Sequence, residues 1–404
     1  MSFLKTAYCR AFQAGMKVGN CFLGYRIPER IEGAGCIKEL PTRIKSAGIK
    51  KTLVVTDNGI IGLGLQEPLL KAMDEAGLAY VVFSNIQPNP TDENVEAGFK
   101  AFREAGCDAI VAFGGGSPMD CAKAIAAKNA HPNMTVKKLQ GVLKVHKRIV
   151  PLWAIPTTAG TGSETTVASV ITEASTHHKA SINDHAIMPR YAVLDAELTV
   201  GLPPSITATT GMDALCHAVE SYTNWTYCTK LEKDFSKRAV RMIHDNIYKA
   251  YRNGTNMEAR QAMQLAAFYA GRSFTRGCVG YVHAIGHTLG GLYGVPHGLA
   301  MSVIMPHVLR QYGSAVYKRL AELADVCGIE GETDERKAVR FIEWIEEMNE
   351  RMGIPTGFDC IKGEDVSRII RWADKEANPL YPVPVVWEYA DFEKLINAIS
   401  IPKK

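Results

Sequence analysis

The sequence predicts an α/β domain followed by an all-helical domain, and two observations lead to this fold class. From about residue 30 to residue 200, short apolar β-rich runs alternate with amphipathic helical patterns, which favours a parallel sheet covered on both faces. After the two prolines at 203–204 the pattern is helical nearly to the end of the 404 residues. Because consecutive prolines interrupt both helices and strands, we expect the α/β domain at 1–202 and the helical domain at 203–404.

The expected strands are apolar, β-rich runs bounded by turn signals. They occupy 51–57, 78–85, 108–116, 149–158 and 191–197. Helical patterns lie between some of them, at 66–77 and 94–106, and longer ones fill the second half at 209–224, 232–254, 257–274 and 335–353. The first twenty or so residues are basic and contain no acidic residue, so we expect a helix or an extension there rather than a transit peptide.

Composition and charge exclude several classes of protein. The chain is 47% hydrophobic and 22% charged, as is usual for a globular protein. Its net charge of +4 is spread along the chain, which argues against a nucleic-acid partner. No apolar run approaches the roughly 18 residues that cross a membrane. The ten cysteines form no CxxC pair, as expected for reduced thiols in a cytoplasmic protein.

The stretch HAIGHTLGGLYGVPHG holds three of the eleven histidines. His283 and His287 are four residues apart, so they lie on one face if the segment is helical. Asp213 and His217 share this spacing, and His297 follows a break at YGVP. One carboxylate and up to four imidazoles suit zinc or ferrous iron better than calcium or magnesium. Individual histidines can also be purely structural, and the HExxH pattern of metallopeptidases is absent.

A glycine loop follows the expected strand at 108–116. Gly115 and Gly116 lead into a helix, for which Ser117 is the expected N-cap and Pro118 the first helical residue. The free N–H groups and the dipole at such a helix start suit a phosphate group. The loop matches neither GxGxxG nor the Walker A motif, and an ordinary turn would also explain it.

Two further positions suit a nucleotide. Thr157 and Thr158, in the loop IPTTAGTGSETT, either bind phosphate or ribose or cap a turn. Asp57 ends the strand TLVVTD, where a carboxylate can accept hydrogen bonds from a ribose 2′-OH. Its alternative role is to cap the turn that follows.

Four motifs together resemble those of the iron-containing (group III) alcohol dehydrogenases. They are GGGSPMDCAKAIA, IPTTAGTGSE, GMDALCHAVESY and VHAIGHTLGGLYGVPHG, and they occur in the order of that family. The resemblance covers about residues 25–395 and implies a dinucleotide-binding α/β domain before a metal-binding helical domain. The chain departs from the family in its first twenty or so residues, which are longer than in many members.

The resemblance also implies a role for particular residues. The metal ligands would be Asp213, His217, His283 and His297. The cofactor contacts would be Asp57, Gly115, Gly116, Ser117, Thr157, Thr158, Thr166 and Lys179. His287 would lie near the metal and the nicotinamide, either as a proton relay or as a packing partner of the ring. Phe274 would line the substrate pocket.

The implied reaction is the reversible oxidation of a small alcohol or diol to an aldehyde or ketone. The resemblance implies Fe²⁺, with Zn²⁺ also acceptable to these ligands, and NAD in preference to NADP. We expect a homodimer or a higher homo-oligomer. The alternatives are a zinc-dependent glycerol-type dehydrogenase or dehydroquinate synthase of the same fold, or a metal- and nucleotide-binding protein without turnover.

Overall fold

The computed structural model describes residues 2–176 and 179–402, and the chain divides into two compact units. One unit is Gly24–Gly201, and the other combines Met1–Leu23 with Leu202–Lys404. The α/β unit therefore begins at Gly24 and not at residue 1 as predicted. The N-terminal segment forms helix α1 (Ser2–Asn20), which belongs to the helical unit. It does so because its side chains donate hydrogen bonds to the backbone of the C-terminal segment, for example from Gln13 to the carbonyls of Pro379 and Tyr381.

The α/β unit contains a six-stranded sheet with strand order β1-β9-β6-β4-β2-β3. Its strands are β1 (Glu29–Glu32), β2 (Lys51–Val55), β3 (Ala79–Phe83), β4 (Ala109–Gly114), β6 (Leu152–Pro156) and β9 (Tyr191–Leu194). Neighbouring strands run parallel in every pair. The parallel sheet expected from the sequence is therefore confirmed.

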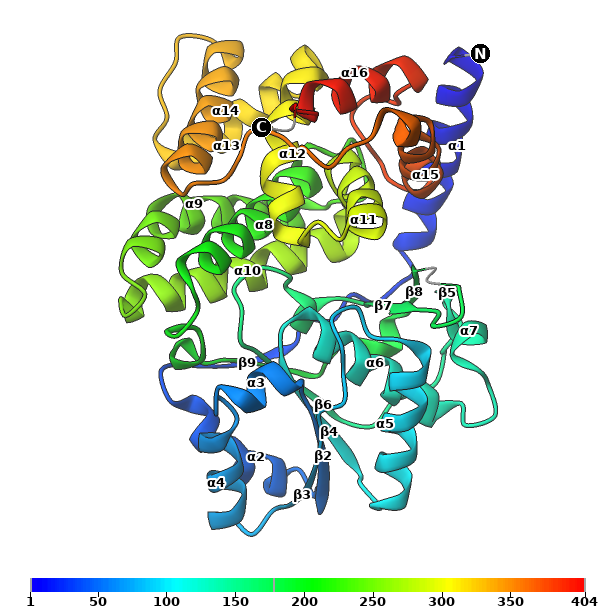
Figure 1. The fold of residues 1–404 in the computed structure, drawn as a ribbon, viewed down its shortest axis with the longest axis vertical. Coiled ribbons are helices and arrows are strands. Elements are labelled where there is room, and N and C mark those ends of the chain that lie inside the picture. The colour runs from blue at the N-terminus through cyan, green and yellow to red at the C-terminus, as the bar shows by residue number, and fades with distance from the viewer. Residues whose placement is uncertain (1, 177–178, 403–404) are drawn as a thin grey trace. The chain divides into compact units, whose positions relative to one another are not determined.

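Helices cover both faces of this sheet (Figure 1). They are α2 (Leu40–Ser46), α3 (Asn58–Gly62), α4 (Glu67–Glu75), α5 (Asp92–Glu104), α6 (Gly116–Ala130) and α7 (Val136–Leu139). Alternate strand residues point to opposite faces, so Val55 packs in the core with Ile125 of α6. Its neighbour Val54 packs in the other core with Met73 of α4. Burial on both faces explains why these strands are continuous apolar runs.

The sequence did not predict four of the strands. Strand β1 reads ERIE and buries only Ile31, so it has no apolar run to identify it. A second sheet joins β5 (Gly141–Val142), β8 (Lys179–Asn183) and β7 (Ala168–Thr172), in that order. Its strands are short or carry polar residues, and β7 and β8 run antiparallel. Four short 3₁₀ helices lie at Cys36–Lys38, Ser163–Thr165, His185–Ile187 and Ala196–Thr199.

The helical unit contains nine helices after α1 in the described part of the chain. They are α8 (Pro204–Thr223), α9 (Lys230–Arg252), α10 (Met257–Gly277), α11 (Tyr281–Tyr293), α12 (His297–Tyr312), α13 (Tyr317–Cys327), α14 (Asp334–Arg351), α15 (Val366–Ala377) and α16 (Tyr389–Ile399). Short 3₁₀ helices lie at Gly313–Ala315 and Gly363–Asp365. No helix in the described ranges combines the length and hydropathy needed to span a membrane.

Helix α8 is the centre of this unit because α9, α10 and α12 all pack against it. Every residue from Gly211 to Thr223 is buried, so the polar side chains on this stretch are carried into the interior. Helix α12 approaches α8 closely at Gly298. A Cβ at that position would lie 2.5 Å from the carbonyl oxygen of Thr209, so only glycine permits the approach.

Candidate metal centre and nucleotide loops

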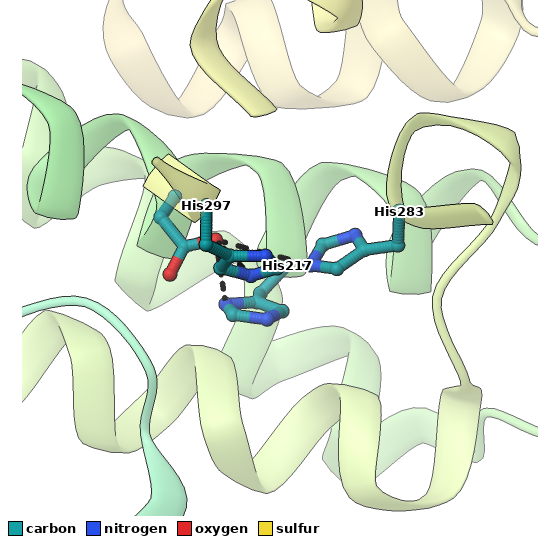
Figure 2. Close-up of side chains that lie close together, drawn as sticks. His217, His283 and His297 are labelled. Carbon is teal, nitrogen blue, oxygen red and sulfur yellow. Dashed lines mark ion pairs between the residues drawn. The ribbon is translucent and has the colours of Figure 1, made fainter. Parts of the chain in front are cut away.

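Three helices bring four potential metal ligands together in the helical unit. Asp213 and His217 lie one turn apart on α8, His283 lies on α11, and His297 is the first residue of α12. One ligand atom from each residue lies within 4.8 Å of the others. Figure 2 shows the three imidazole rings gathered around this point. The helical spacing expected for the Asp–His and His–His pairs is therefore present.

A single carboxylate oxygen lies at the middle of the group. Asp213 Oδ1 is 3.3 Å from His297 Nε2, 3.8 Å from His283 Nε2 and 3.9 Å from His217 Nδ1. The side chains of Asp213, His217 and His283 are buried, whereas that of His297 is 42% exposed. Three of the four side chains are therefore shielded from solvent, and solvent reaches the group beside His297.

Three atoms of this group are buried without a hydrogen-bond partner among the described residues. They are Asp213 Oδ1, His217 Nδ1 and His283 Nε2. An unsatisfied buried polar atom costs about 1–3 kcal/mol, so three in one place form an unfavourable arrangement for a purely structural cluster. A cation would use all three atoms as ligands. The residues present therefore fit a divalent metal with nitrogen and oxygen ligands.

Burial sets the protonation states that metal binding needs. Burial lowers the pKa of His217 to about 3 and that of His283 well below its ordinary value. Burial alone would raise the pKa of Asp213, but the nearby histidines outweigh it and hold that pKa below its ordinary value. Neutral imidazoles and an ionised carboxylate are the forms that bind metals.

Glu220 holds His283 from the side opposite Asp213. Its Oε2 lies 2.6 Å from His283 Nδ1, and its Oε1 accepts a hydrogen bond from Val282 N at 2.8 Å. Burial raises the pKa of Glu220 to about 7. When Glu220 is ionised it can only accept, so Nδ1 then carries the proton and Nε2 faces Asp213 as a potential ligand. The sequence analysis did not assign Glu220. Its spacing from Asp213, seven residues along the same helix, places it on the same face and would have indicated it.

His287 and Phe274 lie beside this group. His287 Nδ1 is 2.7 Å from Glu376 Oε1 on α15. The His287 ring stacks on His297 at 5.2 Å between centroids, and it is outside the set of four converging ligands. Phe274 stacks on His217 at 4.1 Å. The structure thus gathers all six predicted residues of the helical unit and adds Glu220 and Glu376.

In the α/β unit, the glycine loop joins β4 to α6. Helix α6 begins at Gly116 with Gly115 as its N-cap, so the prediction that Ser117 caps this helix is wrong. The first turn starts earlier because Met119 N donates to Gly115 O, and Ser117 Oγ instead accepts from Asn89 N. Gly114, which the sequence analysis left without a role, has φ +147°, a conformation that requires glycine.

The second loop is fastened to the first. Thr157 N donates to Gly114 O at 3.1 Å, and Thr158 is the nearest side chain to Gly115. Thr166 lies deeper, and its hydroxyl accepts a hydrogen bond from the buried Lys123 Nζ at 2.7 Å. Thr157 and Thr158 thus lie beside the glycine loop, whereas the hydroxyl of Thr166 anchors its own loop to Lys123 of α6.

The two remaining nucleotide candidates lie at strand ends. Asp57 Oδ1 accepts a hydrogen bond from Ile60 N at 2.9 Å and caps α3, which leaves Oδ2 outside this capping bond. Lys179 Nζ donates to Asn89 Oδ1 at 2.8 Å, and burial lowers the pKa of Lys179. Since Asn89 also donates to Ser117, it connects two predicted cofactor residues that are far apart in the sequence.

Comparison with known protein families covers nearly the whole chain. Residues 28–196 match the profile described as iron-containing alcohol dehydrogenase, and residues 207–399 match the C-terminal profile of that family. The chain is 40% identical over 348 residues to the NAD-dependent methanol dehydrogenase of Bacillus methanolicus, a match that covers 85% of this chain and 91% of the relative. It is 37% identical to the 1,3-propanediol dehydrogenase of Klebsiella pneumoniae, covering 80% of this chain and 84% of that one.

Solved structures show the same relationship. A 1,3-propanediol oxidoreductase aligns with a TM-score of 0.89 at 33% identity, covering 93% of this chain and 99% of that one. The sulfoacetaldehyde reductase of Bifidobacterium kashiwanohense, solved in complex with NAD⁺, aligns with a TM-score of 0.84 at 28% identity, covering 94% and 99%. The sequence and fold comparisons therefore lead to one family.

Proposed function

This chain belongs to the iron-containing alcohol dehydrogenase family, and we propose that it interconverts a small alcohol or diol and its aldehyde with a nicotinamide cofactor. The observation that carries the proposal is the convergence of Asp213, His217, His283 and His297, with three of their buried polar atoms unpartnered among the described residues. A structural cluster would satisfy those atoms within the protein.

We propose these four residues as the ligands of a divalent metal, Fe²⁺ in the first place, with Zn²⁺ accepted by the same donors. When bound, the ion supplies a Lewis acid for the substrate oxygen. Asp213 contributes the negative charge, and His217 and His283 contribute neutral imidazoles held by burial. The half-exposed His297 marks the side from which a small substrate reaches the group.

The neighbouring side chains have proposed roles in proton transfer and substrate fit. Glu376 accepts a hydrogen bond from Nδ1–H of His287, and in this tautomer Nε2 is the atom that can take up the proton of the alcohol. Phe274 presents an apolar ring against His217. Such a wall excludes water and suits a short alkyl chain.

The α/β unit supplies the proposed nucleotide site, and the bound nicotinamide carries the hydride. The start of α6, with Gly115, Gly116 and Ser117, offers N–H groups to the pyrophosphate. Thr157, Thr158 and Lys179 provide further hydroxyl and ammonium contacts, and Thr166 acts through Lys123 by supporting the loop. Asp57 Oδ2 accepts from the ribose and repels a 2′-phosphate, so we propose NAD over NADP.

The metal ligands are tested by substitution at the open side of the group. His297→Ala is expected to lose most bound metal and turnover while the α/β unit stays folded, because that unit has its own cores. Elemental analysis of anaerobically purified protein is paired with an assay of NADH oxidation over a panel of short aldehydes. His307→Ala is the control, since His307 is a partly buried histidine of the same helix, outside the proposed ligand set, whose ring contacts the backbone of Thr356. Normal metal content and turnover in His297→Ala would remove His297 from the site.

The cofactor preference is tested at Asp57. Asp57→Ser keeps an oxygen that can cap α3 but removes the negative charge, so the efficiency ratio of NADP to NAD is expected to rise roughly 10-fold, about 1.4 kcal/mol. Kinetic constants with both cofactors measure it. An unchanged ratio would contradict the ribose contact.

We also propose a cytoplasmic location and self-association. All ten cysteines are free thiols and five are buried, as is usual in a reducing compartment. Phe3, Leu4 and Tyr8 on α1 are exposed apolar side chains, which is typical of a surface that meets another protein. Light scattering coupled to size exclusion measures the oligomeric state, and a monomer at all concentrations would contradict self-association.

A further inference from the structure

His287 lies at the end of a series of hydrogen bonds within the helical unit. Its Nδ1 lies 2.7 Å from Glu376 Oε1, and the hydroxyl of Tyr381 donates to the same oxygen at 3.0 Å. Burial raises the pKa of Tyr381 well above its ordinary value, so its phenol remains a donor at neutral pH. A carboxylate oxygen can only accept, so the contact with Glu376 favours the tautomer of His287 that carries its proton on Nδ1.

Tyr381 lies in an irregular segment whose backbone is held by helix α1. Gln13 Nε2 donates to the carbonyls of Pro379 and Tyr381, at 2.9 and 2.7 Å. One turn earlier, the two terminal nitrogens of Arg10 donate to the carbonyls of Val383 and Pro384, both at 2.8 Å. Side chains of α1 thus satisfy carbonyls on both sides of Tyr381.

Polar side chains make many of the contacts of α1 with the unit, and Lys5 also pairs with Asp374 on α15 at 2.8 Å. A helix that packs by apolar burial turns its hydrophobic face inward. Helix α1 instead buries the amide of Gln13 completely and exposes Phe3 at 82% and Tyr8 at 61%. Figure 1 shows α1 running beside α15, the helix that carries Glu376. The inward face of α1 therefore presents side-chain donors to the backbone carbonyls of the segment 379–384.

We propose that Gln13 and Tyr381 are positioning residues for the reaction. Gln13 fixes the segment that carries Tyr381, Tyr381 fixes Glu376, and Glu376 fixes the tautomer and the ring orientation of His287. The proposal rests on the role given above to His287. It also assigns a purpose to the N-terminal helix, which the family resemblance left without one.

The first test removes single atoms from the series in the full-length, zinc-loaded protein. Tyr381→Phe deletes one hydroxyl, and Tyr389→Phe is its matched control, because the Tyr389 hydroxyl contacts Ser367 at an exposed site. In Tyr381→Phe we expect kcat to fall roughly 10-fold, with the KM for alcohol and the zinc content unchanged. Unchanged kcat in Tyr381→Phe, as in the control, would overturn the proposal.

The second test reads the imidazole directly and does not depend on turnover. In ¹⁵N spectra of histidine-labelled protein, His287→Asn identifies the His287 signals. We expect the Nδ1–H form in the parent protein and a mixture of the two neutral tautomers in Glu376→Leu, which offers no acceptor to Nδ1. A purely Nδ1–H spectrum in Glu376→Leu would overturn the proposal.

The helix itself is tested with Gln13→Met, which keeps the length of the side chain but removes its donors and the oxygen that accepts from Trp225 Nε1. We expect a mixture of His287 tautomers and a loss of kcat smaller than that of Tyr381→Phe. Lys17→Met, on the exposed face of the same helix, is the control. Parent-like spectra and kcat in Gln13→Met would remove α1 from the series. A parent protein with no turnover would instead contradict the proposed function, while the spectra still test the positioning.

Discussion

Two buried polar clusters, one in each unit, differ in how their atoms are satisfied. In the α/β unit, the ammonium of Lys123 donates to Ser163 Oγ, Thr166 Oγ1 and the carbonyl of Ala168, at 2.9, 2.7 and 2.9 Å. In the helical unit, Asp213, His217 and His283 each leave a buried atom without a hydrogen-bond partner among the described residues. In the first cluster all three ammonium donors have acceptors within the protein. In the second, a bound cation would supply the missing partner of the three buried atoms.

This difference separates two roles that the sequence does not distinguish. An ammonium has three donors, and Lys123 uses all of them to fasten the loop 163–168 to α6. The hydroxyl of Thr166, which was expected to contact the cofactor, accepts one of these hydrogen bonds. Residue type alone does not separate these two roles. Whether a buried polar group already has hydrogen-bond partners within the protein is the better guide to whether it binds a ligand.

The largest effect is expected from breaking the satisfied cluster. Lys123→Met takes the ammonium donor away from two buried hydroxyls and from the part-buried carbonyl of Ala168, so the α/β unit should lose about 3–5 kcal/mol of stability. Hydrogen exchange of β4 and β6 measures the loss, and zinc binding by the helical unit should stay unchanged. The exposed Lys100→Met on α5 is the control. Exchange rates equal to those of the parent would show that the cluster does not stabilise the unit.

A smaller effect is expected from changing the tautomer of His283, a proposed ligand in the unsatisfied cluster. In Glu220→Gln the amide oxygen takes the Val282 N–H, so the amide N–H₂ faces His283 Nδ1 and favours a proton on Nε2. Zinc affinity should fall about 10–100-fold, measured by competition with a chromophoric chelator. Glu376→Gln is the matching substitution beside His287, which is not a proposed ligand, and should leave the affinity unchanged. Equal affinities in all three proteins would contradict the assignment of His283.

The smallest effect is a pH dependence at Glu164, a buried residue of the loop 163–168 that interacts electrostatically with Lys123. Burial raises the pKa of Glu164 to about 7, whereas an unfolded glutamate has a pKa of about 4.3. The folded form therefore binds the extra proton between these values, and its stabilising contribution is lost as the pH rises. Stability of the α/β unit should fall by about 1–2 kcal/mol from about pH 5 to about pH 7, relative to Glu164→Gln. Parallel stability curves for the two proteins would contradict this shift.

The sequence predicted those parts of the structure that depend on local pattern. Apolar runs such as LVV in β2 identify strands buried on both faces, and the four-residue spacing of Asp213 and His217 identifies two members of the proposed metal group. Strand β1 escaped prediction because only Ile31 of its four residues is buried. Glu376 escaped because it reaches His287 across 89 residues. The place of helix α1 in the helical unit escaped prediction because its polar face points inward, opposite to the usual pattern.

The close approach at Gly298 has a consequence for how this enzyme can be altered. Even an alanine there would meet the Thr209 carbonyl, and relieving that clash would displace the start of α12 together with the adjacent His297. In a saturation library, position 298 should therefore be almost invariant although its own residue binds nothing. A library aimed at the choice of alcohol should therefore vary Phe274, the proposed substrate-pocket residue, and keep glycine at position 298.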